Sequence, residues 1–306
     1  MIVNALRLCF GTLTILPVRP PGELDRRTGG WAMVLAPLAA LALAVPTLAL
    51  IRLLHWQQSS YVSYAFGQVG TRIEAPSRLP AMLVAGLLVG LVALLTRAMH
   101  LDGLADTADG LGSGKPAEQA LGIMRKSDIG PFGVVTLVLV LLVQVAALQQ
   151  LLSRGLGLPA VAAALVVSRL MLPVACSRGI RGARADGLGA LVAGSVGRVQ
   201  LLLSAGLAAA CLLVAFLAAL PLRQPTLVAQ GTLTVVTYRH GPVPASLVPP
   251  VVGSVVWPAV LLLGALLVGG LLLWRCVRRF GGVTGDVLGA CVEATFTAAL
   301  VLLCLA

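Results

Sequence analysis

Long apolar runs dominate the chain, and short segments between them hold most of the charged residues. A run of about 18–20 apolar residues crosses a bilayer as an α-helix, and these runs do not alternate as the strands of a β-barrel do. We therefore predict an all-α, polytopic helical bundle that forms one membrane-embedded domain over residues 1–306. The seven predicted spans are Trp31–Leu54, Pro80–Met99, Gly133–Leu152, Pro159–Cys176, Val199–Leu220, Val255–Trp274 and Val287–Leu305.

The segments outside these runs have characters of their own. Residues 4–16 are amphipathic and too short to span, so residues 1–30 are predicted to lie at the membrane interface. No cleavable signal peptide is evident, and insertion is expected to depend on the first span. The long segments 56–80 and 222–250 are predicted to be external loops.

Composition excludes a soluble protein and gives the bundle an orientation. Mean hydropathy is +0.99, and only 11% of residues are charged. The net charge of +11 has no basic face interleaved with aromatic residues, so we predict no nucleic-acid partner and expect contact with membrane lipids. Arginines are more frequent before span one and in the loops between spans two and three, four and five, and six and seven than in the other loops. Because positive charge is enriched on the cytoplasmic side, this distribution predicts a cytoplasmic N-terminus in the cell (inner) membrane. The six scattered cysteines form no CxxC pair and are interpreted as packing residues.

Three of only eleven acidic residues fall within the stretch HLDGLADTADGL, residues 100–111. On a helix, Asp102, Asp106 and Asp109 stand at i, i+4 and i+7, within about 60° of one face. Carboxylates this close repel one another unless a cation neutralises them, and a ligand set of oxygens alone favours Mg²⁺ or Mn²⁺. The alternative is a polar helix end or a capping turn. His100 is interpreted mainly as an interfacial or packing residue.

Two further features fit a phosphorylated ligand. Gly110 and its neighbouring glycines allow close backbone approach, and the motif IMRKSDIGPFG places Arg125 and Lys126 beside Asp128 and Gly130. The cations are candidates to hold a pyrophosphate, while Asp128 is a candidate to accept a proton or to join the metal site. The alternative is a basic pair next to the membrane followed by a helix start.

Charged residues within the predicted spans complete the candidate site. Arg169 lies in the middle of span four, where an unpaired charge is costly, so it should meet a carboxylate or a substrate phosphate. Asp286 follows Gly285 at the start of span seven, and Glu293 lies seven residues further on, on the same face. A structural ion pair for Arg169 and a capping role for Asp286 are the alternatives.

Taken in order, HLDGLADTADGL, IMRKSDIGPFGV, the Ser168–Arg169 pair and GGVTGDVLGACVE resemble the cobalamin synthase family, the adenosylcobinamide-GDP ribazoletransferases. The resemblance runs nearly end to end. It implies a membrane enzyme that joins adenosylcobinamide-GDP to α-ribazole or its 5′-phosphate, releases GMP and uses Mg²⁺ at the cytoplasmic face. A homo-oligomer is also compatible with an enzyme of this size.

On this interpretation the candidate residues fall into three groups. Asp102, Asp106 and Asp109 would bind metal. Arg125, Lys126 and Arg169, with Gly110, Gly130 and Gly285, would hold the phosphorylated substrate. Asp128, Asp286 and Glu293 would be catalytic.

Two other functions remain open from the residues alone. Residues 106–110 fit the opening of the signature of the CDP-alcohol phosphotransferases, but the rest of that signature is absent. An ion-coupled transporter could use Arg169 and Glu293 within the membrane, yet such proteins often show inverted repeats, and none is apparent here.

Overall fold

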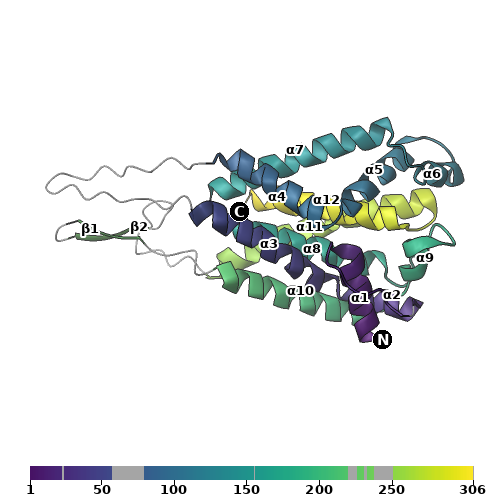
Figure 1. The fold of residues 1–306 in the computed structure, drawn as a ribbon, viewed down its shortest axis with the longest axis horizontal. Coiled ribbons are helices and arrows are strands. Elements are labelled where there is room, and N and C mark those ends of the chain that lie inside the picture. Colours follow the sequence, from purple (N-terminus) through teal and green to yellow (C-terminus); the bar gives the residue numbers. More distant parts are fainter. Residues whose placement is uncertain are drawn as a thin grey trace.

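The computed structural model describes residues 1–22, 24–56, 79–154, 156–219, 226–230, 233–237 and 251–305. Long helices run side by side along the longest axis of the molecule. Five shorter helices gather at one end, which we call the polar end (Figure 1). The long helices are α3 (Ala36–Trp56), α4 (Ala81–Leu95), α7 (Pro131–Ser153), α8 (Gly157–Ala175), α10 (Arg198–Ala219), α11 (Val251–Phe280) and α12 (Gly285–Leu303). The polar end contains α1 (Ile2–Leu13), α2 (Arg26–Val34), α5 (Met99–Gly112), α6 (Ala117–Ile123) and α9 (Gly187–Val192).

Each predicted span overlaps one long helix, so the helical membrane fold is confirmed. The first span, Trp31–Leu54, also includes the end of α2, and the sixth, Val255–Trp274, ends inside α11. Four helices of the described residues are long and apolar enough to cross a membrane, or up to six if two bent pairs count as single spans. The bent pairs are α2–α3, with a bend of 47°, and α4–α5, with a bend of 89°. The count of seven spans and the orientation of the N-terminus therefore stay predictions.

The sharp α4–α5 bend has a local backbone cause. Arg97 and Ala98 have φ values of 54° and 53°, a left-handed conformation that L-residues other than glycine rarely adopt. The chain leaves α4 in a new direction, so α5 lies across the polar end instead of continuing the span (Figure 1). This turn places the aspartates of α5 outside the long helices.

One element departs from the predicted loop at 222–250. Thr226–Gln230 (β1) and Leu233–Thr237 (β2) form an antiparallel hairpin in which Thr226 pairs with Thr237. The hairpin lies at the end of the molecule opposite α6 and α9 (Figure 1). The other part of that predicted loop, and the loop predicted at 56–80 except for its ends, lie outside the described residues.

Helix α12 lies at the centre of the bundle, where it packs against α5, α8 and α11. It is by far the most buried of the four single helices that could span a membrane, with 67% of its 18-residue apolar stretch buried inside the protein. Large apolar side chains on α7, α10 and α11 are instead exposed, among them Phe132, Leu202 and Leu267. An exposed apolar belt of this kind is what a lipid-facing surface requires.

Candidate active site

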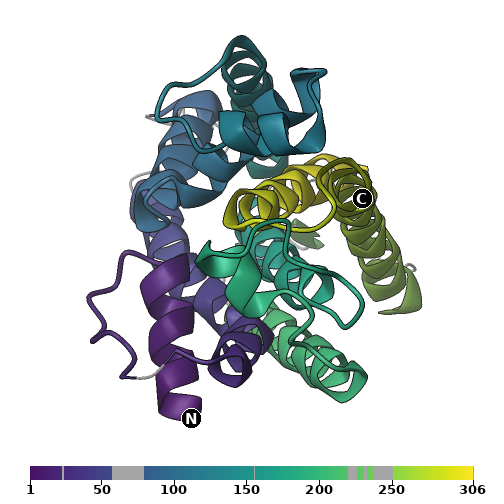
Figure 2. The same ribbon diagram turned by 90° about the vertical axis from the view of Figure 1, so that its right-hand side faces the viewer.

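The acidic residues of the described chain are concentrated at the polar end. Glu293 alone lies deep within the bundle, while the others belong to the short helices, their connections or the first turn of α12. Viewed from that end, the connection between α8 and α10 passes through the middle of the face, between α1 and α12 (Figure 2). The candidate site lies under this connection.

Two glycines allow α5 and α12 to cross closely. A Cβ on Gly103 would lie 2.6 Å from the backbone oxygen of Asp286, and a Cβ on Gly289 would lie 3.3 Å from Cα of His100. The first distance is far below a normal contact, so only glycine permits this crossing. The close crossing brings Asp102 and Asp106 of α5 beside Asp286 of α12.

Asp106 is at the electrostatic centre of this acidic group. The pKa of its carboxyl is raised to about 7, first by partial burial and then by the negative charges of Asp102, Asp286 and Asp109, in that order of effect. The Arg184 guanidinium acts in the opposite direction. Three other carboxylates and one arginine are therefore close enough to affect Asp106, and this concentration of negative charge favours binding of a cation.

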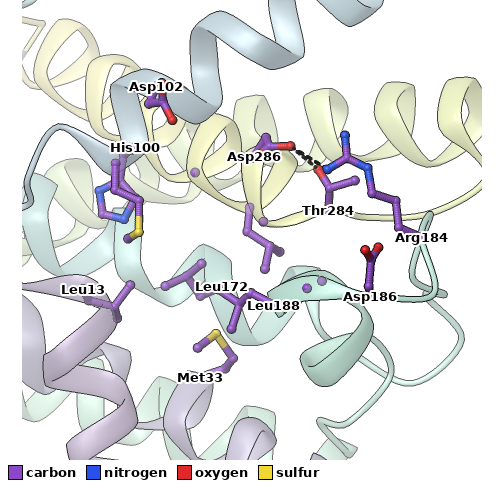
Figure 3. Close-up of a pocket in the computed structure, with 16 residues that line it drawn as sticks. Leu13, Met33, His100, Asp102, Leu172, Arg184, Asp186, Leu188, Thr284 and Asp286 are labelled. Carbon is purple, nitrogen blue, oxygen red and sulfur yellow. Dashed lines mark hydrogen bonds and ion pairs between the residues drawn. The ribbon is translucent and has the colours of Figure 1, made fainter. Parts of the chain in front are cut away.

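Asp286 is held by a short network at the start of α12 (Figure 3). The Thr284 hydroxyl caps the helix by accepting the Val287 N–H, and it donates to Oδ2 of Asp286 at 3.2 Å. Nη1 of Arg184 lies 3.4 Å from the same oxygen, and Nη2 donates to the Leu121 carbonyl at 2.8 Å. Nε of Arg184 is buried without a partner among the described residues, so the guanidinium has donor capacity to spare.

Asp109 has a different environment from the other two aspartates of α5. Only 7% of the residue is exposed, and its two oxygens accept the backbone N–H groups of Gly130 and Gly133, at 2.8 and 2.9 Å. These N–H groups belong to the first turn of α7, where a negative charge is stabilised by the helix dipole. Asp109 therefore joins α5 to the N-terminus of α7, with both of its oxygens engaged.

A cavity of about 300 Å³ opens between α5, α9 and α12. Asp102 and Asp286 lie on one side of it and Arg184 and Asp186 at another, while Leu13, Met33, Leu172 and Leu188 form the opposite wall (Figure 3). His100 also contributes to the lining. Complete burial lowers the pKa of its imidazole well below the ordinary value, and the nearby Arg169 charge lowers it further. Its Nε2 has no hydrogen-bond partner among the described residues.

The turn after α6 carries three of the predicted site residues, and all three side chains are exposed. Arg125 forms an ion pair of 2.6 Å with Asp186, while Lys126 and Asp128 are not part of the cavity lining. The pair joins the turn after α6 to the start of α9. Arg125 is thus paired with a residue that lines the cavity, whereas Lys126 and Asp128 lie outside the lining.

Arg169 and Glu293 belong to a buried polar cluster within the long helices. Arg169 is 2% exposed and donates to the Ser168 hydroxyl at 2.9 Å, and its charge interacts with that of Glu293. Oε1 of Glu293 accepts from Nε2 of Gln144 at 2.6 Å, and the same nitrogen donates to the Thr297 hydroxyl at 2.9 Å. Neither Arg169 nor Glu293 lines the cavity.

The three predicted substrate-contacting glycines differ in their surroundings. Gly285 lines the cavity. A Cβ on Gly110 would instead meet Met124 at 2.7 Å, and one on Gly130 would clash with the Asp109 carboxylate. Gly110 and Gly130 therefore permit close packing between helices.

Arg184 and Asp186 were not predicted as site residues, although both line the cavity. Arg184 stands among several arginines of one connection, and 102 residues separate it from Asp286. No local spacing in the sequence distinguishes it from Arg178 or Arg181. Only the packing of α9 beside the start of α12 does so.

The donor chemistry of the site suits Mg²⁺. Within the described part of the chain, no three His, Cys, Asp or Glu side chains are close enough to surround an ion by themselves. Magnesium usually needs only one or two protein carboxylates, because water and substrate phosphates complete its coordination. Asp102 and Asp106, one helical turn apart and free of the contacts that engage Asp109, fit that requirement.

Fold and site together define a class: an integral-membrane enzyme with an acidic pocket and an adjacent arginine, suited to a phosphorylated substrate. The chain belongs to the cobalamin-5-phosphate synthase family, whose model matches residues 5–304. This membership makes it an enzyme of cobalamin assembly.

Curated relatives agree over nearly the full length. The adenosylcobinamide-GDP ribazoletransferase of Nocardioides sp. is 37% identical over 97% of this chain and 96% of its own. The protein of the same name from Frankia casuarinae is 36% identical over 97% and 93%, and that from Pseudomonas putida is 33% identical over 92% and 90%. No solved structure gives a significant match.

Proposed function

We propose that the chain transfers the adenosylcobinamide phosphate group of adenosylcobinamide-GDP to a hydroxyl of α-ribazole or its 5′-phosphate. GMP is the second product. The names of the relatives support this reaction. The observation that supports it in this chain is the convergence of Asp102, Asp286 and Arg184 on one cavity at the polar end, with Asp106 close enough to interact with all three.

The chemistry is a substitution at the phosphorus attached to cobinamide. The acceptor oxygen forms a bond to that phosphorus, and the bond from phosphorus to the bridging oxygen of the diphosphate breaks. GMP leaves with the bridging oxygen and its electron pair. The proton of the attacking hydroxyl passes to a carboxylate, for which Asp286 is the best placed of the predicted catalytic residues because it alone among them lines the cavity.

The other side chains act by position and charge. Arg184 would stabilise the negative charge that develops on the transferred phosphoryl oxygens, since its guanidinium lies beside Asp286 and its Nε has no partner among the described residues. Asp109 would keep α5 in register against α7 and so fix where Asp102 and Asp106 stand. It is a positioning residue on this account.

Asp102 and Asp106 would hold Mg²⁺, which supplies Lewis-acid polarisation of the diphosphate oxygens when bound. The proposed location of the polar end, and with it the site, is the cytoplasmic face of the cell membrane, and the positive-inside distribution of arginine supports it.

Purified protein in lipid nanodiscs tests the proposal when it is mixed with adenosylcobinamide-GDP, α-ribazole and Mg²⁺. The expected result is release of GMP together with an equal amount of corrinoid product. Asp106→Asn should lower turnover by at least about 100-fold, the usual scale for loss of a catalytic electrostatic contact. Glu118→Gln is the matched control, because Glu118 is an exposed acid of the same end that does not belong to the group of charges around Asp106. Absence of both products with every divalent cation tried would exclude the proposed reaction.

A further inference from the structure

The cavity at the polar end has two chemically different sides. Its acidic side is described above, and the opposite wall is apolar and comes from four separate helices. Leu13 of α1, Met33 of α2 and Leu172 of α8 line the cavity but are at most 3% exposed, and Leu188 of α9, which is more exposed, lines it beside them (Figure 3). A phosphate transfer needs only the acidic side, so the apolar wall calls for a separate explanation.

We infer that this apolar wall binds the benzimidazole base of the acceptor, with the ribose directed toward Asp102 and Asp286. The inference depends on the proposed function and specifies which part of which substrate occupies the cavity. The base of α-ribazole is a flat bicyclic ring with two methyl groups, whose burial against leucine and methionine side chains is favourable. The imidazole of His100 adds an aromatic ring to the same lining.

The two other large groups in the reaction fit the cavity less well. Guanine presents several hydrogen-bond donors and acceptors on its edges, and burying them against an apolar wall would leave them unpaired. A corrin ring is far larger than a cavity of about 300 Å³, which is near the lower limit for small-molecule pockets. The base of the acceptor is the one group that matches both the size and the polarity of the wall.

The orientation also follows from the two-sided lining. With the base against Leu188, the ribose points across the cavity toward Asp286, the proposed proton acceptor. The donor phosphate must then approach from the acidic side, next to Asp102 and Arg184. Acceptor and donor would therefore meet between the apolar wall and the acids.

Leu188 offers a precise test because it is only partly buried and α9 carries a matched control. Leu188→Ala removes part of the apolar wall, while Leu191→Ala makes the same change at a partly buried leucine that does not line the cavity. We expect Leu188→Ala to raise the KM for α-ribazole about 10-fold, a typical effect of lost apolar contact in a pocket. The KM for adenosylcobinamide-GDP should stay within twofold in both variants.

A second acceptor makes the test specific for the base. Wild-type protein should prefer α-ribazole over the riboside of unmethylated benzimidazole, and Leu188→Ala should reduce that preference. Equilibrium dialysis with labelled α-ribazole should show the same loss of affinity without turnover, and Leu188→Met, which conserves volume, should restore it.

The outcomes separate this inference from the proposed function. If the wild type forms no GMP from the complete mixture, the proposed function fails. If the wild type is active but Leu188→Ala leaves the KM for α-ribazole unchanged, or raises the KM for the donor instead, the assignment of the wall to the base is wrong.

Discussion

Replacing Asp109 by alanine separates the structural role of one aspartate from the chemical role of its neighbours. The change removes the acceptor for two backbone N–H groups, those of Gly130 and Gly133, at a site that is 7% exposed. A hydrogen bond to a charged group contributes about 1.5–3 kcal/mol, and a charge at a helix N-terminus adds about 0.3–1 kcal/mol. Water entering the gap recovers part of this, so we expect the free energy of unfolding to fall by about 2–4 kcal/mol.

Asp106→Ala is the matched comparison on the same helix. The Asp106 carboxylate makes no hydrogen bond in the described part of the chain and is repelled by Asp102, Asp286 and Asp109. Its removal should leave stability unchanged or slightly higher while turnover is lost. Asp109→Ala should show the reverse pattern, with lower stability and partly retained turnover.

Thermal unfolding in nanodiscs, followed by tryptophan fluorescence, measures the difference. One kcal/mol shifts the midpoint by about 2–4 °C in a chain of comparable size, so the Asp109→Ala midpoint should fall by several degrees. Equal midpoints for the two variants would refute the assignment of Asp109 as the residue that joins α5 to α7. Complete loss of turnover in Asp109→Ala at full stability would instead make it a metal ligand.

Three further changes test other parts of the structure. Gly103→Ala should force α5 and α12 apart, because its Cβ would lie 2.6 Å from the Asp286 backbone oxygen, and we expect about 1–3 kcal/mol of destabilisation and lost turnover. Gly86→Ala, where a Cβ would have no atom within 4 Å, should be neutral in the same unfolding and GMP-release assays. Arg125→Ala removes an exposed ion pair worth about 0–1 kcal/mol, so the unfolding midpoint should shift by less than about 4 °C at any salt concentration, and a larger fall would contradict this. Glu293→Leu should destabilise the protein by about 3–5 kcal/mol, since it removes the negative charge that acts on the buried Arg169 and one of the two acceptors of the buried Gln144 amide. A stable variant with a raised KM would instead place Glu293 in the substrate site.

The sequence predicts the bundle well because membrane insertion depends on local run length. Each apolar run became a helix, with Pro131 at the first position of α7 and Thr284 capping α12. The predicted spans miss the bend at Arg97 and Ala98, because neither residue type signals a left-handed backbone. They also miss the β-hairpin, which replaces part of a predicted loop.

For the site, helical spacing correctly places Asp102, Asp106 and Asp109 on one helix at the polar end. It cannot show that Asp109 faces the first turn of α7, since that contact depends on how Gly130 packs against α5. The role of Arg184 depends likewise on contact between segments about 100 residues apart. Local pattern therefore identifies the acidic helix, and only tertiary packing distinguishes its individual aspartates.

Isotope tracing tests the central claim most directly. α-Ribazole labelled with ¹⁸O at its acceptor hydroxyl is incubated with adenosylcobinamide-GDP, Mg²⁺ and the purified protein, and both products are analysed by mass spectrometry. The account predicts that the corrinoid product contains the label and that GMP contains none, because the acceptor oxygen attacks the phosphorus attached to cobinamide. Label in GMP, or a corrinoid phosphate without label, would contradict it.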